Sequence, residues 1–598
     1  MANDDIPTHA DEQTTSAQPS APPRPPRIWP GLLLVAAFWS FVFAISLPEL
    51  PISTAFLSRA GATALLTLLF PIWWLAHRST RLADRLWGMG AAVVGGAAAI
   101  MLSQKTLGTF GVLFSGLPVV FTAWAAWLFV ARKRSPRIQR AGMIATIVVA
   151  WMYFTLIRMD GLSGDLKADI RWRWAPRTED AYLSERSRTG DGAVGSGETF
   201  DRDQGTVLEP GPGDWPAFRG AQRDGQVRGI EIANHWETAP PQLVWRHRIG
   251  PAWSSIAVVG DRLFTQEQVG EREAVVSLDA ATGGRIWSHE DTARLRDSQG
   301  GDGPRGTPTF ADGRIYSQGA TGILNCLDAA TGKVAWSRNI ADDSGAATPM
   351  WGFSSSPLVI EGLVIAYAGG KDGKGLLAYH TDSGELAWTA ATGPISYSSA
   401  QLAWFDGEPQ VLFLSDTGLV GVEPLSGKIL WEYEGAAPGM WRAVQPMTTG
   451  AASVVVGSED LGIVRLDIGR RGDAWTVAKG WQSKAMRPGY NDFVIQDGFA
   501  YGFDGGIFCC SDLETGKRRW KKGRYGHGQV LLVADERLLL VISETGEVVL
   551  LHATPEAHEE IARFQAIEGK TWNHPVIARE CLFVRNDQEI ACYRLRLK

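Results

Sequence analysis

The chain is poor in cysteine and in charge. Its 598 residues include only five cysteines, and charged residues make up 20%. No cysteine falls in a C-x-x-C or C-x-x-C-H spacing, so zinc, thioredoxin-like redox and attached-haem motifs are not indicated. The cysteines lie in apolar, strand-like runs, where we expect reduced core residues. They are Cys326, Cys509, Cys510, Cys581 and Cys592. The net charge is -6 and the sequence has no basic stripe, so nothing in its charge indicates a nucleic-acid partner.

Ionisable residues are also scarce in five apolar segments that follow a polar, Pro-rich start. Residues 1–27 are predicted to form a disordered cytoplasmic tail. The apolar segments are 29–47, 60–76, 86–103, 110–131 and 141–158. Each is close to the roughly 20 residues that cross a hydrocarbon core, so residues 28–158 are predicted to form a five-helix membrane anchor. A transporter would carry polar groups within its spans, and a plain anchor is therefore favoured over a further membrane function.

The loops between these segments indicate their orientation. Arginine and lysine gather before the first segment, between the second and third, and between the fourth and fifth, whereas the other two loops carry only Arg59 and Lys105. The positive-inside rule then places the N-terminus in the cytoplasm and everything beyond about residue 159 in the periplasm, with inner-membrane lipid around the spans. Residues 159–213 are interpreted as a periplasmic juxtamembrane segment with a short interfacial helix and a Gly/Ser/Asp-rich linker.

A ten-residue motif recurs through the rest of the chain. LDAATGGRIW ends at Trp287 and LDAATGKVAW at Trp336, and later copies follow at intervals of 43 to 52 residues. This is the period of a four-stranded propeller blade. Asp and Thr-Gly favour a tight turn, and the aromatic residue after it is predicted to wedge between blades. These blade-docking residues are Trp245, Trp287, Trp336, Trp388, Trp431, Trp475, Trp520 and Phe564.

The two ends of the repeat region complete each other. After Phe564, three strand-like segments have no outer strand, whereas QLVWRHRI, residues 242–249, has the outer-strand pattern without a preceding turn. Pairing them gives eight blades and removes an open sheet edge. We therefore predict that residues 214–598 form an all-β, eight-bladed propeller, closed by 242–249 pairing with the C-terminal strands.

The segments that lead into the innermost strands are rich in aromatic and polar residues, and radial symmetry makes them converge on the mouth of the central channel. Such a mouth suits a flat polar ligand or a peptide. In the alternative interpretation these side chains only satisfy loop backbone groups. No loop with calcium-binding spacing is visible, so no metal site is predicted, and no catalytic residue is assigned. The candidate ligand-binding residues are Trp253, Arg305, Trp351, Tyr397, Trp441, Arg442, Tyr490, Asn491, His527, Gln529, Trp572, Asn573 and His574.

The copies A-x-D-A-x-T-G-x-x-x-W, together with the lead-in WPAFRGAQRDG at 215–225, resemble the pyrroloquinoline quinone (PQQ)-like propeller repeat family over about residues 214–598. That family includes quinoprotein dehydrogenases and non-enzymatic propellers similar to the outer-membrane assembly factor BamB. The layout of five spans before a propeller also resembles membrane-bound quinoprotein glucose dehydrogenase.

For an enzyme, the resemblance implies PQQ, a calcium ion held by Asn, Asp and Glu, an Asp base such as Asp492 or Asp504, and long insertions. It also implies a disulfide between adjacent cysteines. Cys509 and Cys510 lie within a predicted strand, where neighbouring side chains point to opposite faces, so that disulfide is not expected. Blades of about 44 residues leave little room for insertions.

Three functions remain open. The favoured one is a binding or scaffolding module for a protein or envelope component, without a cofactor. The alternative is a PQQ-dependent alcohol or sugar dehydrogenase that passes electrons to membrane quinone. Sensing of a small ligand at the channel mouth is a third possibility.

Overall fold

The structure is a computed structural model that describes residues 28–47, 52–77, 80–189, 208–297, 299–435 and 442–598. The chain divides into two compact units, a helical unit that ends at Leu156 and a second unit that contains Ile157–Lys598. The predicted tail at 1–27 and most of the predicted Gly/Ser/Asp-rich linker lie outside the described residues.

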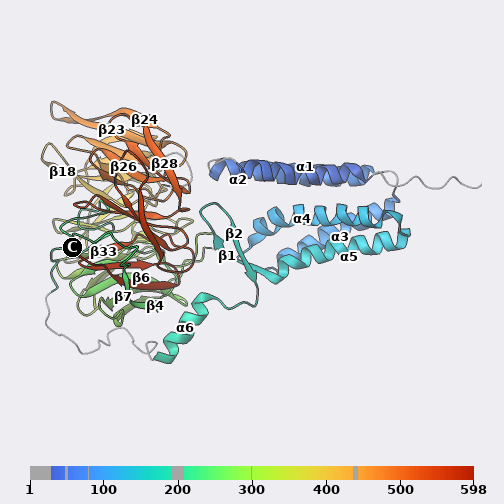
Figure 1. Ribbon diagram of the computed structural model, residues 1–598, viewed down its shortest axis with the longest axis horizontal. Helices are drawn as coiled ribbons and strands as arrows, with labels where there is room; N and C mark the ends of the chain where they lie inside the picture. Colours follow the sequence, from blue (N-terminus) through green and yellow to red (C-terminus); the bar gives the residue numbers. More distant parts are fainter. Residues whose placement is uncertain (1–27, 48–51, 78–79, 190–207, 298, 436–441) are drawn as a thin grey trace, which may run out of the picture. The chain divides into compact units, whose positions relative to one another are not determined.

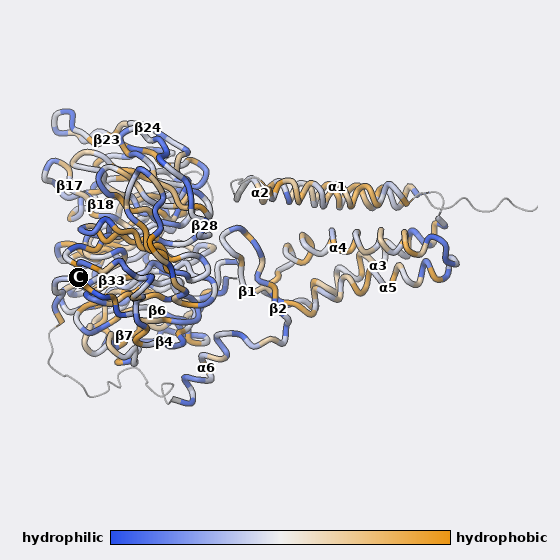
Figure 2. The backbone as a smooth tube through the Cα atoms, in the orientation of Figure 1, coloured by the Kyte–Doolittle hydropathy of each residue, from blue (hydrophilic) through white to orange (hydrophobic). Residues whose placement is uncertain are grey.

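The helical unit contains, among the described residues, five helices that are long and apolar enough to cross a membrane. They are α1 (Trp29–Ser46), α2 (Ile52–Ala76), α3 (Leu82–Leu102), α4 (Gly108–Val130) and α5 (Pro136–Leu156), and a 3-10 turn, η1 (Ala131–Lys133), follows α4. Apolar residues predominate along these helices (Figure 2). The five predicted spans are confirmed, but α2 begins at Ile52 rather than 60, so Arg59 lies within a helix and not in a loop.

Small residues let the helices of this unit approach one another closely. A Cβ on Gly116 of α4 would lie 2.6 Å from the Trp151 ring, and one on Gly96 of α3 would lie 3.1 Å from it. Because lipid tails are as apolar as leucine, such close packing is what holds membrane helices together.

The second unit is an eight-bladed propeller, with eight sheets of antiparallel strands in the described residues (Figure 1). Blades 1 to 4 comprise β5 (Ala257–Val259), β6 (Arg262–Val269), β7 (Arg272–Asp279) and β8 (Arg285–Asp291); β9 (Thr309–Ala311), β10 (Arg314–Gln318), β11 (Ile323–Asp328) and β12 (Val334–Asn339); β13 (Leu358–Ile360), β14 (Leu363–Tyr367), β15 (Leu376–His380) and β16 (Leu386–Ala390); and β17 (Gln401–Phe405), β18 (Glu408–Leu414), β19 (Gly418–Val422) and β20 (Ile429–Glu434).

Blades 5 to 7 comprise β21 (Met447–Thr448), β22 (Ser453–Ser458), β23 (Gly462–Arg471) and β24 (Ala474–Ser483); β25 (Val494–Gln496), β26 (Phe499–Asp504), β27 (Ile507–Asp512) and β28 (Arg518–Arg524); and β29 (Gln529–Val533), β30 (Leu538–Ile542), β31 (Glu547–His552) and β32 (Glu560–Gln565). A short helix, α7 (Ile340–Ser344), follows β12, and β3 (Gln226–Val227) adds a parallel strand to β29.

Blade 8 closes the ring with strands from both ends of the propeller sequence. It consists of β33 (Val576–Ala578), β34 (Cys581–Arg585), β35 (Glu589–Arg594) and β4 (Gln242–Arg248). Trp245 of β4 lies opposite Cys592 of β35 in an antiparallel register. The predicted closure and the blade count are therefore confirmed.

The repeated motif forms a hairpin turn that receives an aromatic ring from the preceding blade. Asp279 Oδ1 accepts hydrogen bonds from the backbone N–H of Thr282 (2.8 Å) and from its hydroxyl (2.8 Å). Gly283 has a φ of +71°, and a Cβ there would lie 2.6 Å from the Trp245 ring. Equivalent indole N–H groups donate to a carbonyl of the next blade at 2.9 to 3.0 Å, in the pairs Trp245 to Ala280, Trp287 to Ala329, Trp336 to Thr381, Trp388 to Pro424 and Trp520 to Thr554.

Blade 5 departs from the predicted docking pattern. Its β23–β24 hairpin is longer than the others, and Trp481, not Trp475, donates to the next blade at Leu513 O (3.2 Å) over Gly516. Trp475 lies further out on the hairpin under Arg470 at 4.1 Å. The longer hairpin of blade 5 offers no equivalent turn to Trp431 of blade 4. Trp431 donates instead to Gln410 of its own blade (2.7 Å).

Gly472 and Asp473 lie in the turn between β23 and β24. Phe564 of β32 packs against Trp236 and Tyr593, with ring centroids 5.9 and 5.1 Å away.

A buried carboxyl between blades 1 and 2 leads to a pH prediction. Burial, aided by Asp291, raises the pKa of Glu273 to about 7, although Glu273 also accepts a hydrogen bond from Ala320 N. The neutral form is therefore the stable one, and stability is lost as pH rises from the ordinary pKa toward 7. Glu273→Gln keeps the hydrogen-bond acceptor but cannot ionise. Its effect on the free energy of unfolding should therefore be more stabilising at pH 8 than at pH 4, by about 2–3 kcal/mol.

Denaturant titrations of the detergent-solubilised chain at the two pH values measure this difference. The exposed Glu271→Gln is the matched control, since its side chain is 70% accessible and should show no comparable pH dependence. An equal effect of Glu273→Gln at pH 4 and pH 8 would contradict the prediction.

Candidate ligand site at the channel mouth

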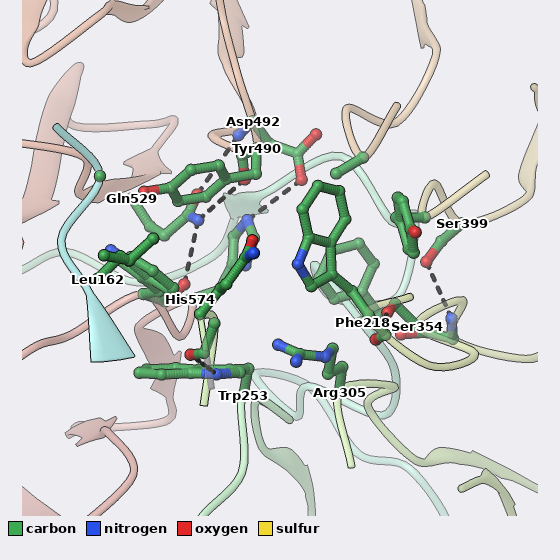
Figure 3. Close-up of a pocket in the computed structure, with 18 of the residues that line it drawn as sticks. Leu162, Phe218, Trp253, Arg305, Ser354, Ser399, Tyr490, Asp492, Gln529 and His574 are labelled. Atoms are coloured by element: carbon green, nitrogen blue, oxygen red, sulfur yellow. Dashed lines mark hydrogen bonds and ion pairs between the residues drawn. The ribbon is translucent and has the colours of Figure 1, made fainter. Parts of the chain in front are cut away.

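A cavity of about 170 Å³ lies where the segments before the innermost strands converge. Its lining residues come from segments that precede β5, β9, β13, β17, β21, β25 and β33, and from the first residue of β29. Several of them are labelled in Figure 3. Blades far apart in the sequence therefore contribute to one site, as expected from radial symmetry.

The floor of the cavity is formed by the lead-in segment at 215–227. This segment crosses the channel and is fastened to inner strands around the ring. Trp215 exchanges two backbone hydrogen bonds with Val258 of blade 1, and Gly225 O accepts from Leu532 N of blade 7 at 2.9 Å. Arg223 donates to carbonyls that precede blades 3 and 4, Pro357 at 2.9 Å and Ala400 at 3.1 Å. Phe218 reaches the cavity from this floor.

An ion-pair cluster lies beside Phe218. Arg219 Nη1 is 3.3 Å from Asp492 Oδ1. His574 Nε2 is 3.2 Å from Asp492 Oδ2 (Figure 3). Burial works to raise the pKa of Asp492, but the Arg219 guanidinium and His574 outweigh it and hold that pKa below its usual value. Burial lowers the pKa of His574, against the opposing effect of Asp492. The ring of Phe218 meets that of His574 edge-on at 5.0 Å.

Aromatic rings and Arg305 form the walls, and Lys570 lies beside one of these rings. Trp572 packs against Trp253 (4.9 Å between ring centroids) and Tyr490 (5.0 Å). The Lys570 ammonium lies 4.2 Å from the Trp572 ring, and burial lowers its pKa. Arg305 is held by Asp297 at 2.7 Å on the same side as Trp253 (Figure 3).

The roof is formed by residues that directly follow the last membrane helix. A hairpin of β1 (Ile157–Leu162) and β2 (Ala168–Trp172) extends its loop over the mouth, so that Leu162, Ser163, Gly164 and Leu166 line the cavity. Helix α6 (Thr178–Thr189) follows the hairpin and packs on blade 1, where the Tyr182 hydroxyl donates to buried Glu267 at 2.8 Å. The helix expected in this segment exists, and it lies against the propeller.

The structure brings most of the candidate ligand-binding residues together. Eight line the cavity: Trp253, Arg305, Trp351, Tyr397, Tyr490, Gln529, Trp572 and His574. Asn491 and Asn573 instead donate to the carbonyls of Gly528 and Ser254. This is the alternative role considered for such side chains.

The remaining candidates lie elsewhere. His527 packs under the roof loop rather than lining the cavity, and Arg442 is not among the lining residues. Trp441 falls outside the described residues. Asp504 is away from the cavity and is paired with Arg487, Arg518 and Lys521.

Several residues of the site were not predicted. The roof loop, Lys570 and Phe218 carry no local pattern that marks a ligand site. The one sequence signal for the floor was WPAFRGAQRDG, which combines arginines with aromatic residues. In the structure these arginines are buried, since Arg219 and Arg223 are 1% and 4% exposed.

Comparison with known proteins agrees with this architecture. Residues 271–522 match the family model described as outer membrane protein assembly factor BamB. The propeller is PQQ-like.

Two curated relatives of the PQQ-like propeller are dehydrogenases. Quinohemoprotein alcohol dehydrogenase ADH IIB of Pseudomonas putida is 33% identical over 126 residues, which cover 20% of this chain and 18% of the relative. Quinoprotein alcohol dehydrogenase PedH of P. putida strain KT2440 is 29% identical over 194 residues, which cover 30% of this chain and 29% of the relative. The chain therefore spans less than a third of either relative.

Among solved structures, BamB from Moraxella catarrhalis superposes with a TM-score of 0.46 at 16% identity, covering 59% of this chain and 99% of that one.

Among the described residues that line the cavity, carboxylate ligands for a calcium ion beside a quinone are scarce. Calcium takes 6–8 oxygen ligands. Asp492 is the one carboxylate among the described lining residues. Both of its oxygens are engaged by Arg219 and His574, and Oδ1 also accepts a hydrogen bond from Gln445 N at 2.8 Å. In the described part of the chain, no group of three His, Cys, Asp or Glu residues could hold a metal ion.

The adjacent cysteines do not contribute to the site either. Cys509 and Cys510 are both free and buried in β27. Cys509 packs with Phe493 and Met486, whereas Cys510 packs in a different cluster with Tyr501. The two thiols thus point to opposite faces of the sheet, in line with the strand interpretation.

Proposed function

We propose that this chain is a membrane-anchored binding or scaffolding module of the cell envelope, which holds a protein or another envelope component at the channel mouth of its propeller. The five apolar helices lie in inner-membrane lipid, the N-terminus is cytoplasmic and the propeller is periplasmic. The arginine-rich loops before α1, between α2 and α3, and between α4 and α5 support this orientation through the positive-inside rule.

The observation that carries the proposal is the state of Asp492. It is the carboxylate best placed in the cavity for either metal binding or proton abstraction, yet Arg219 and His574 flank its two oxygens. Its lowered pKa favours a fixed carboxylate that holds the floor segment in place over a general base tuned near neutral pH. The aromatic walls and polar rim suit binding.

The alternative is a PQQ-dependent dehydrogenase that oxidises an alcohol or sugar and reduces membrane quinone. The observation that favours it is the sequence similarity of 33% and 29% to two alcohol dehydrogenases over parts of the chain.

Addition of PQQ and calcium to the purified full-length chain in detergent tests the two functions. We expect no stoichiometric quinone absorbance on the chain after desalting and no dye reduction with a panel of primary alcohols and aldoses. The purified chain treated with calcium alone is the matched control. Stoichiometric PQQ binding accompanied by turnover would overturn the binding-module proposal.

A further inference from the structure

The mouth of the cavity is already occupied by a peptide segment of this chain. Residues 162–166, Leu-Ser-Gly-Asp-Leu, form the loop of the β1–β2 hairpin, and all of them except Asp165 line the cavity. The loop is a tight turn in which Leu166 N donates to Ser163 O at 2.9 Å. This segment, called the roof loop below, shows which kind of chain the mouth accepts.

The propeller binds the backbone of the roof loop at three points. Leu162 N donates to Gln299 O at 2.8 Å, and Leu162 O accepts from Lys570 Nζ at 3.2 Å. Gly164 N donates to Glu544 Oε1 at 2.5 Å. Backbone bonds of this kind recognise a peptide irrespective of its side chains, and they come from two different regions of the ring.

One position of the roof loop is restricted to glycine by the propeller itself. A Cβ on Gly164 would lie 2.2 Å from Cδ2 and Cγ of His527. His527 is fixed from below, since its backbone N–H donates to Glu544 Oε2 at 3.2 Å. The contact with His527 therefore requires glycine at position 164.

The next position is matched by a side-chain contact. Asp165 Oδ1 lies 3.4 Å from His527 Nε2. The hydrogen bond from His527 lowers the pKa of Asp165 to about 2, despite partial burial that works in the opposite direction. Asp165 is otherwise exposed, so the contact adds specificity for an acidic residue after the glycine.

We propose that the channel mouth is a peptide-recognition site that the roof loop fills in cis, and that the partner presents a turn of the same chemistry, a glycine followed by an acidic residue, which displaces the roof loop. This inference rests on the proposed binding function and names the class of its partner. Lys570, Glu544 and His527 are the recognition residues.

The tether makes the cis occupant a strong competitor. A segment joined by a short connection has an effective concentration on the order of millimolar. A free peptide of the same sequence must compete against that concentration. Its apparent affinity is therefore its intrinsic affinity multiplied by the fraction of chains with an open mouth. Weakening the roof loop alone should therefore expose the site without altering it.

Fluorescence anisotropy with a labelled peptide of residues 161–167, GLSGDLK, tests this in the full-length chain. The variant Gly164→Ala, whose added Cβ prevents seating of its own loop, should bind this peptide at least tenfold more tightly than the wild-type chain. Gly211→Ala is the matched control because its Cβ would meet only Asp214 at 3.8 Å, and its affinity should equal that of the wild type. A peptide with alanine in place of its second glycine should not bind to any of these chains.

Two further measurements make each outcome decisive. Gly164→Ala combined with Glu544→Ala should lose the gained affinity, because the acceptor of the glycine N–H is removed. Asp165→Ala, an exposed substitution that leaves the recognition residues intact, should give a smaller gain in peptide affinity, and it serves if Gly164→Ala fails to fold. Hydrogen exchange at residues 162–166 reports whether the roof loop is released.

If exchange shows release and the labelled peptide still does not bind, peptide recognition is wrong, while the binding-module function stands or fails separately by the PQQ experiment. If the loop stays protected in both Gly164→Ala and Asp165→Ala, displacement of the roof loop is wrong.

Discussion

Replacing Trp388 with alanine should lower the free energy of unfolding of the propeller by about 3–5 kcal/mol, the usual cost of truncating a core tryptophan. Trp388 is 8% exposed, and its indole N–H donates to Pro424 O of the next blade at 2.9 Å. Its ring also covers Gly427, where a Cβ would lie only 2.5 Å away. Truncation therefore removes a hydrogen bond and opens a cavity between two blades at once.

Trp475→Ala is the matched control for this prediction. The sequence motif assigns Trp475 the same docking role, but the structure places it on the protruding part of the β23–β24 hairpin, where it is half-buried and stacked by Arg470. Its truncation should cost about 1 kcal/mol or less, because surface substitutions rarely exceed this range. Denaturant unfolding of both variants in detergent gives the comparison. Equal losses, or a loss below 1 kcal/mol for Trp388→Ala, would contradict the docking role.

The contrast between these two tryptophans shows what sequence patterns can predict in this protein. A blade hairpin is a local structure, since Asp279, Thr282 and Gly283 interact within five residues, and local hydrogen bonding makes it recur visibly. The blade count and the closure then follow because the last blade lacks an outer strand, which residues 242–249 supply. The six-residue extension of blade 5 shifted the docking position from Trp475 to Trp481, because a copy of the motif also occurs at the tip of the longer hairpin.

The candidate site was predictable only in part, for a related reason. Residues that precede each inner strand converge by symmetry, so eight of them could be assigned to the cavity from the sequence. The floor and the roof come from segments that belong to no blade. Arg219 reaches Phe493, 274 residues away, and Gly164 reaches Glu544, 380 residues away. Contacts of such sequence separation leave no periodic signal in a single sequence.

Arg219→Met should also cost about 3–5 kcal/mol, because it leaves Asp492 as a buried carboxylate without its main cation. Arg219 is 1% exposed and Asp492 is 2% exposed. The guanidinium also donates to Phe493 O at 2.6 Å, so the substitution removes one of the bonds that attach the lead-in segment to blade 6. Removal of one partner of a buried pair is far more costly than the pair's net contribution, since the remaining charge stays desolvated.

Arg228→Met, directly after the lead-in segment, provides the control. Arg228 pairs with Asp224 at 2.6 Å, a shorter distance than that of the buried pair, but 45% of its side chain is exposed. Exposed ion pairs are typically worth at most about 1 kcal/mol, so this variant should stay close to wild-type stability. Similar losses in Arg219→Met and Arg228→Met would show that the burial of the Arg219–Asp492 pair has no energetic consequence.

The pH dependence of Arg219→Met distinguishes loss of the ion pair from loss of packing alone. In the wild-type chain, the lowered pKa of Asp492 contributes stability that is present above its unfolded pKa of about 3.9 and is lost as the pH falls further. The variant lacks most of that contribution. The difference in unfolding free energy between wild type and variant should therefore be largest near pH 7 and shrink toward pH 3, whereas a packing defect would cost the same at both. Because the Arg219–Asp492 pair holds the floor on which Phe218 and His574 rest, this measurement also shows whether the cavity depends on a charged floor.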